Sequence, residues 1–204
     1  LIARFWDVQQ GEVIVGGSNV KEMTCDALLK NISMVFQKVY LFNDTIMNNL
    51  RFGNPIATDE QVVEAAKKAR CHDFIMALEG GYDTIIGEGG STLSGGEKQR
   101  ISIARAMLKD APIVLLDEAT SNVDPENEEH IQSAINELVK NKTLIVIAHR
   151  LSNIRLADQI LVLDEGRLVE QGTHAQLVEL NGLYNRLWNR REQARSWKIS
   201  SQTE

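Results

Sequence analysis

The chain has 204 residues, and its 22 lysine and arginine residues stand against 28 aspartate and glutamate residues, a formal net charge of −6. This length exceeds what one small domain needs, so we expect one α/β domain with an attached lobe. The acidic balance argues against a non-specific grip on nucleic acid or anionic lipid, although a local basic patch stays open. Cys25 and Cys71 lie far apart without metal-like spacing, which favours free thiols over a disulfide.

The first half of the chain predicts short strands followed by a helical lobe. Residues 12–15 and 32–36 are apolar-rich runs separated by glycines and polar residues, a pattern typical of strands or strand edges. From about residue 41 to residue 109 the sequence becomes helical. Thr58 with Gln61 three residues later forms a capping-box pattern, which indicates a helix start within this lobe.

The second half returns to alternating strands and helices. Residues 125–139 predict a helix with Asp124 as N-cap and Pro125 at its first position. Apolar runs predict strands at residues 113–116, 143–147, 160–163 and 167–170, the last two as a hairpin. Strand–helix–strand order with nearly continuous apolar strands implies a largely parallel sheet covered on both faces.

The tail from Thr173 is helical again and carries a run of arginines. These are Arg186, Arg190, Arg191 and Arg195. A solvated helix face is the simpler interpretation of such a run, and a contact with a partner or a membrane surface is the sharper one.

Two neighbouring segments carry residues suited to nucleotide chemistry. Asp117 and Glu118 end a predicted buried strand, where one carboxylate could help to hold Mg²⁺ and the other could polarise a water molecule. Ser94, Gly95 and Gly96 open a predicted helix, where a hydroxyl and unhindered N–H groups can approach a phosphate. Taken alone, the first could be an acidic strand end and the second an ordinary turn.

Together these segments form residues 93–124, LSGGEKQRISIARAMLKDAPIVLLDEATSNVD, which closely resemble the signature, Walker B and D-loop region of ABC ATPases. The family also places a glutamine and a histidine after other strands, and Gln37 follows ISMVF while His149 follows TLIVIA. The resemblance extends to about residue 187. It implies a P-loop NTPase-like α/β fold, with a mostly parallel sheet flanked by helices and an inserted helical subdomain.

The resemblance also implies an organisation for the whole chain. Residues 1–204 would form one ABC ATPase domain that lacks its N-terminal part, with the core at about residues 1–40 and 110–180. The helical subdomain would span about residues 41–109, and a helical tail about residues 173–204.

Roles follow from the same resemblance. Asp117 would hold Mg²⁺ through water, and Glu118 would be the general base for ATP hydrolysis. Gln37 would touch the metal or the attacking water and couple the site to a neighbouring domain. His149 would contact the γ-phosphate, because an imidazole can donate toward phosphate and accept elsewhere.

In this family two ATPase domains sandwich two nucleotides head to tail. Ser94, Gly95 and Gly96, with Glu97 beside them, would therefore bind the γ-phosphate held by the opposite domain, and Asp124 would report across the dimer. Glu97 stands where the commonest signature ends in glutamine, and the D-loop reads SNVD rather than SALD.

One expected motif is missing. No G-x-x-x-x-G-K-[ST] occurs in the sequence, and neither does the upstream aromatic residue that the family stacks on adenine. Residues 1–17 resemble the segment that directly follows the P-loop helix. We therefore expect a truncation just after the P-loop, and a chain that is inactive by itself.

Residues 39–53 and 82–97 resemble the exporter branch. This implies a motor domain at the cytoplasmic face of a membrane, which binds ATP and Mg²⁺, dimerises with an identical or different ATPase domain, and contacts a transmembrane domain through the Gln37 region and Glu88. Glu88 could instead be an exposed loop residue.

Two alternative functions stay open. One is a non-catalytic module that supplies LSGGE to a partner. The other, a nucleic-acid-associated ATPase, is less favoured because no long coiled coil occurs and the net charge is negative.

Overall fold

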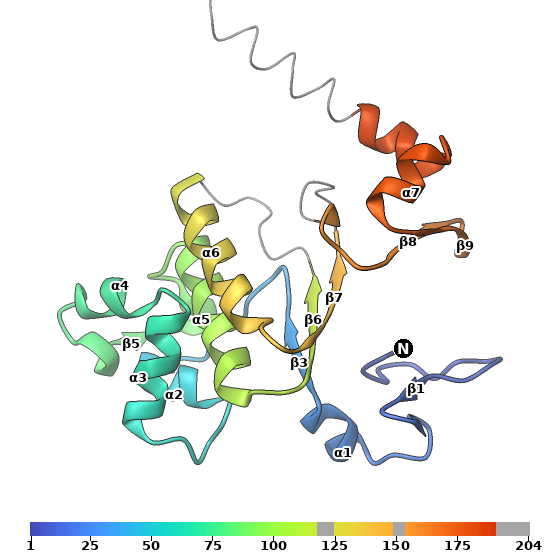
Figure 1. Ribbon diagram of the computed structural model, residues 1–204. Helices are drawn as coiled ribbons and strands as arrows, with labels where there is room; N and C mark the ends of the chain where they lie inside the picture. Colours follow the sequence, from blue (N-terminus) through green and yellow to red (C-terminus); the bar gives the residue numbers. More distant parts are fainter. Residues whose placement is uncertain (118–124, 149–153, 191–204) are drawn as a thin grey trace, which may run out of the picture. The chain divides into compact units, whose positions relative to one another are not determined.

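The computed structural model describes residues 1–117, 125–148 and 154–190. It divides into two compact units, Leu1–Ile147 and Ala148–Glu204. Within the described part of the chain, no helix has both the length and the apolar character needed to cross a bilayer. Figure 1 shows the elements of both units.

A parallel sheet lies at the centre of the first unit. Its strands are β3 (Ile32–Val35), β6 (Ile113–Asp117) and β7 (Thr143–Ile147), in the spatial order β3-β6-β7. Ile32 lies opposite Ile113, which lies opposite Thr143 on its other side. All three strands run the same way, so their carboxyl ends meet at one edge (Figure 1). The predicted parallel sheet is confirmed.

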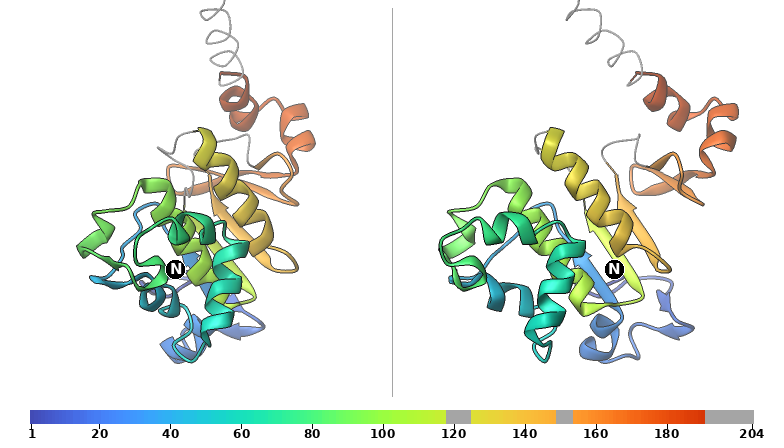
Figure 2. Two further views of the ribbon diagram at one scale, coloured as in Figure 1. Left: turned by 90° about the vertical axis from the view of Figure 1, so that its left-hand side faces the viewer. Right: turned by 60° about the vertical axis from the view of Figure 1, so that its left-hand side comes forward.

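Side chains alternate between the two faces of this sheet. On one face, Val35 and Val114 pack in the main core against α5 (Gly95–Lys109) and α6 (Pro125–Leu138), which Figure 2 shows on the same side of the strands. Residues of the opposite face pack around α1 (Cys25–Lys30). The coverage is incomplete at β7, where every residue is exposed. Among the described residues, the sheet is therefore covered on both faces at β3 and β6 and open at β7.

The N-terminal strand is shorter than predicted. Only Ile14–Val15 forms β1, which pairs with β2 (Ser18–Asn19) as a two-residue hairpin. Gly16 and Gly17 make the turn with positive φ angles of 58° and 82°, a conformation that glycine adopts without steric cost.

The predicted helices of the lobe are present. They are α2 (Ile46–Arg51), α3 (Asp59–Lys68) and α4 (His72–Met76), and β4 (Asp44–Thr45) pairs with β5 (Ile85–Ile86) beside them. The capping box at the start of α3 is confirmed, since Thr58 and Gln61 bond reciprocally. In Figure 1 these helices lie on the far side of α5 from the sheet. Helix α5 is therefore the element between the lobe and the strands.

The second unit contains the predicted hairpin, β8 (Ile160–Asp164) and β9 (Arg167–Gly172), followed by α7 (His174–Glu179). Tyr184 anchors its small core, because the ring is buried and its hydroxyl lies 2.8 Å from Nδ1 of His174. The Glu170 carboxylate accepts the backbone N–H of Tyr184 at 3.0 Å. Arg186 and Arg190 are exposed, whereas Arg191 and Arg195 lie outside the described residues.

The two thiols differ in their surroundings. Both are free, but Cys25 is exposed and Cys71 is buried in the main core. Burial raises the pKa of the Cys71 thiol well above its usual range, because a thiolate there would lose its hydration.

We expect an aromatic disulfide reagent at mildly alkaline pH to modify one thiol per folded chain and both in denaturant. Equal reaction rates for the two thiols in the folded chain would contradict this burial.

Candidate functional site

The signature segment forms a fully capped helix start. Ser94 is the N-cap of α5, with extended backbone angles of −64° and 162°, and its hydroxyl accepts the backbone N–H of Glu97 at 3.3 Å. The Glu97 carboxylate in turn accepts the N–H of Ser94 at 2.8 Å. Either glutamate or glutamine can make this reciprocal bond, which explains why the LSGGE form keeps the same local structure. The Glu97 side chain is thus committed to the cap.

The two glycines of the signature have different surroundings. A Cβ atom on Gly95 would meet nothing within 4 Å, so the backbone there is open to an approaching group. A Cβ atom on Gly96 would lie 2.7 Å from Cγ of Asn127 in α6. The sequence analysis predicts one role for both glycines, the close approach of a phosphate. The structure adds that Gly96 lets the first turn of α6 pack against α5.

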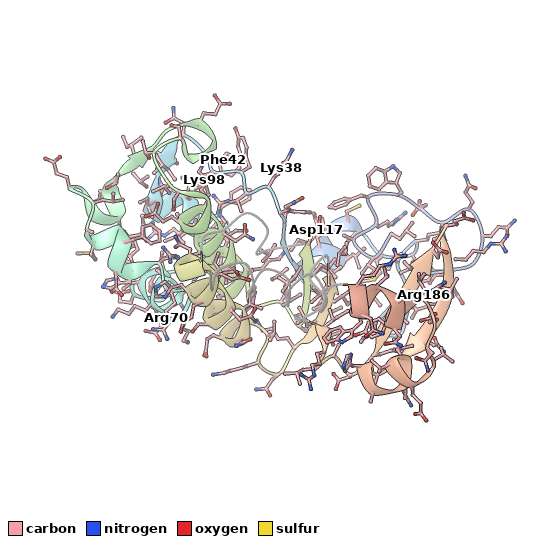
Figure 3. The ribbon with its side chains drawn as sticks, turned by 90° about the horizontal axis from the view of Figure 1, so that it is seen from above. Lys38, Phe42, Arg70, Lys98, Asp117 and Arg186 are labelled. Atoms are coloured by element: carbon pink, nitrogen blue, oxygen red, sulfur yellow. The ribbon has the colours of Figure 1, made fainter. Side chains whose placement is uncertain are left out.

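The carboxyl edge of the sheet holds the candidate metal residues. Asp117 ends β6 and is half-buried, and Gln37 follows the end of β3 at the same edge. In Figure 3, which looks at the molecule from above, Asp117 and Lys38, the neighbour of Gln37, are labelled at this edge. Carboxylate and amide oxygens suit Mg²⁺, so these side chains fit the expected ion. The other predicted residues, Glu118, Asp124 and His149, lie outside the described residues.

The segment after Gln37 is hydrogen-bonded to the loop that contains Glu88. The Tyr40 hydroxyl donates to the Glu88 carboxylate over 3.4 Å, and the Gly89 N–H donates to the Leu41 carbonyl over 3.0 Å. The two stretches that the sequence assigned to a membrane-domain contact are therefore neighbours on one surface. They come from positions nearly fifty residues apart, so the structure brings them together.

A groove of about 310 Å³ opens beside this surface, and the sequence reasoning did not find it. Its lining residues are Phe42, Asn43, Asp44, Asn48, Asn49 and Phe52, which we call the aromatic groove. The Asp44 carboxylate accepts bonds from the Asn48 side chain and the Thr45 N–H, and these bonds lower the pKa of Asp44. The groove therefore combines exposed aromatic surface with one fixed negative charge. The available sequence signal was the spacing of three aromatic residues, Tyr40, Phe42 and Phe52, within one short segment.

Comparison with known proteins identifies the chain. Residues 1–121 match the ABC transporter family. The chain belongs to the ABC transporter family. It is 50% identical over 192 residues to ABC transporter B family member 6 of Dictyostelium discoideum, which covers 94% of this chain and 28% of that protein. It is also 50% identical over 188 residues to an ATP-dependent lipid A-core flippase of Mannheimia succiniciproducens, covering 92% of this chain and 32% of that protein.

A solved structure agrees with this assignment. A bacterial Atm1-family ABC exporter with ATP bound superposes with a TM-score of 0.87 and 45% identity, covering 93% of this chain and 33% of that one. The chain thus has the α/β fold of ABC transporter ATP-binding domains and resembles those of exporters. It spans about a third of the length of these relatives.

The two signature glycines provide a matched pair for mutation. Gly96→Ala forces Asn127 and the start of α6 to move, so we expect the free energy of unfolding to fall by about 1–3 kcal/mol, as overpacking does. Gly95→Ala adds a methyl group to open space at a helix start, so it should change the free energy of unfolding by less than about 1 kcal/mol. Urea unfolding followed by circular dichroism measures both values. An equal fall in the free energy of unfolding of the two variants would show that the contact between Gly96 and α6 does not determine their stability.

Proposed function

We propose that this chain is the ATP-binding and ATP-hydrolysing motor domain of an ABC exporter, located at the cytoplasmic face of a membrane. It couples MgATP hydrolysis in a head-to-tail dimer to the movement of a substrate across that membrane. The observation that carries the proposal is the capped, glycine-rich start of α5 one helix upstream of a β-strand that ends in a carboxylate. The exporter relatives support the choice of branch.

Each chain contributes to two nucleotide sites in this proposal. The open backbone at Gly95 and the Ser94 hydroxyl meet the γ-phosphate held by the opposite domain, where the positive end of the α5 dipole favours an anion. Asp117 and Gln37 serve the chain's own nucleotide by positioning Mg²⁺, which would neutralise charge on the phosphates when bound.

Three residues outside the described ranges complete the proposed site. Glu118 takes the proton from the attacking water, His149 contacts the γ-phosphate, and Asp124 reports the state of one site to the other. Their order along the chain and their places after β6 and β7 support these roles.

The membrane partner contacts the surface formed by the Gln37 segment, the Glu88 loop and the aromatic groove. Aromatic side chains are enriched where proteins bind partners, and three lie here with large exposed fractions, 56% for Tyr40, 41% for Phe42 and 64% for Phe52. A short helix with apolar residues and one cationic or N–H-donating group would match the rings and the Asp44 carboxylate.

A second candidate function is that of a non-catalytic module, which presents its LSGGE cap to a nucleotide bound elsewhere. The capped start of α5 with its open backbone at Gly95 supports this function as well. The two functions differ in whether the chain's own carboxylates act on a nucleotide.

The general base separates the two functions. In protein expressed from the complete reading frame, we expect Glu118→Gln to slow MgATP hydrolysis by about 10²–10⁴-fold, the usual contribution of a general base. Glu129→Gln, an exposed carboxylate on α6, is the matched control and should keep the wild-type rate. Steady-state phosphate release measures both. A Glu118→Gln protein as fast as its parent would refute the proposed role of Glu118.

The nucleotide affinity of the 204-residue chain alone is a further prediction. We expect weak or undetectable MgATP binding, because the P-loop lysine and N–H groups supply most of the grip on the phosphates. Isothermal titration calorimetry with MgATP is the measurement, and magnesium without nucleotide is its control. Micromolar binding would mean that the described residues hold the phosphates without a P-loop.

A further inference from the structure

Arg105, in the third turn of α5, holds two segments that border the aromatic groove. Its Nε donates to the Asn49 carbonyl over 2.6 Å, and one terminal nitrogen donates to the Asn49 side-chain oxygen over 2.6 Å. The other terminal nitrogen donates to the Tyr40 carbonyl over 2.7 Å. The three bonds use the planar geometry of one guanidinium group, which lysine cannot reproduce. Arg105 thereby joins α5 to residues 56 and 65 positions earlier in the chain.

The same guanidinium group lies against the aromatic rings of the groove. Its central carbon is 5.8 Å from the ring centre of Phe42 and 5.6 Å from that of Phe52, and the two ring centres are 4.8 Å apart. Burial lowers the pKa of Arg105 to about 10, so the group stays charged at neutral pH. The attraction between the positive guanidinium group and the electron-rich ring faces favours one arrangement of Phe42 and Phe52.

The backbones of α2 and α5 also meet at Arg105. A Cβ atom on Gly53, just after α2, would lie 2.2 Å from the Arg105 carbonyl oxygen, so no side chain fits between them. Asn49 of α2 completes the connection. Its amide donates to the Phe42 carbonyl over 3.0 Å and its oxygen accepts the Phe42 N–H over 2.9 Å. Both walls of the groove are therefore fixed to one residue of α5.

Helix α5 links this point to the signature. Ser94 caps its start, and Arg105 follows about three turns later in one continuous helix. We propose that Arg105 is a positioning residue that transmits the position of the groove to the Ser94 end of α5, an inference that rests on the proposed function. A displacement of the groove by its partner then moves α5 with it, and a nucleotide that engages Ser94 restrains the groove in return.

The competing explanation is that Arg105 merely stabilises the lobe. Arg51 provides the matched control, because its guanidinium group also donates to a backbone carbonyl, that of Ala57 over 3.1 Å, and pairs with the Asp59 carboxylate. Arg51 does not line the groove. Arg51→Lys and Arg105→Lys both keep a positive charge, and only the second disturbs the connection between the groove and α5.

The first measurement is hydrogen–deuterium exchange without nucleotide, in protein expressed from the complete reading frame. In Arg105→Lys we expect the backbone amide of Phe42 and those of the following α2 residues to exchange about tenfold faster or more, as the loss of a bond from a charged donor implies. Arg105→Met should show a larger increase, and Arg51→Lys, which lies in α2 itself, should leave the Phe42 amide unchanged. Arg105→Lys keeps the test valid if Arg105→Met does not fold.

The second measurement repeats the exchange with MgATP and adds steady-state hydrolysis. In the wild type, MgATP should slow exchange at residues 40–53, and in Arg105→Lys this effect should fall by about fivefold or more while KM for ATP stays within about twofold. A general loss of stability would change both variants alike.

The outcomes separate the inference from the function on which it rests. An active wild type with an intact MgATP effect in Arg105→Lys overturns the inference alone, and so does an equal loss in Arg51→Lys. A wild type that neither hydrolyses MgATP nor shows the effect overturns the proposed function, and the transmission with it.

Discussion

Helix α5 is packed so closely on two sides that no Cβ atom fits at the contacts. Gly53 meets the Arg105 carbonyl on one side, and Gly96 meets Asn127 of α6 on the other. Close packing of this kind allows few relative movements, because added volume must displace the Arg105 backbone at one contact and the Asn127 side chain at the other. The sheet adds a third contact, where the buried Ser33 hydroxyl donates to the Ala106 carbonyl over 3.3 Å. The lobe, the sheet and α6 are thus all positioned by one helix.

This arrangement explains how α5 can carry a polar start on an apolar body. Ile101, Ile103 and Ala104 are buried in the main core, while the capping box satisfies the backbone N–H groups of Ser94 and Glu97 at the start of the helix. The first turn of α5 packs against α6 at Gly96 and stays open at Gly95. A site for a ligand can exist at Gly95 because the contact with α6 is confined to its neighbour.

Local features of the fold were predictable from the sequence, and contacts between distant segments were not. The capping box of Thr58 and Gln61 and the parallel strands depend on spacing within a few residues or on apolar runs, and both were predicted correctly. The Arg105 contacts join residues more than fifty positions apart, so no local pattern signals them. The aromatic groove lies within residues 42–52, but its shape depends on the bonds by which Asn49 holds Phe42. The separate surroundings of Gly95 and Gly96 depend on where α6 lies. Motif order predicted the candidate site residues, of which Gln37, Asp117 and residues 94–97 lie in described regions.

Among the described residues, none of the ion pairs includes Arg105, so no carboxylate balances its charge there. Carbonyl oxygens and ring faces take that role instead. A salt bridge would fix another side chain, whose own rotamers would absorb a displacement. A bond to a carbonyl fixes the backbone itself, at Tyr40 and at Asn49, so the position of the chain on both sides of the groove depends directly on the guanidinium group. In the proposed transmission, these acceptors connect the backbone on both sides of the groove to α5.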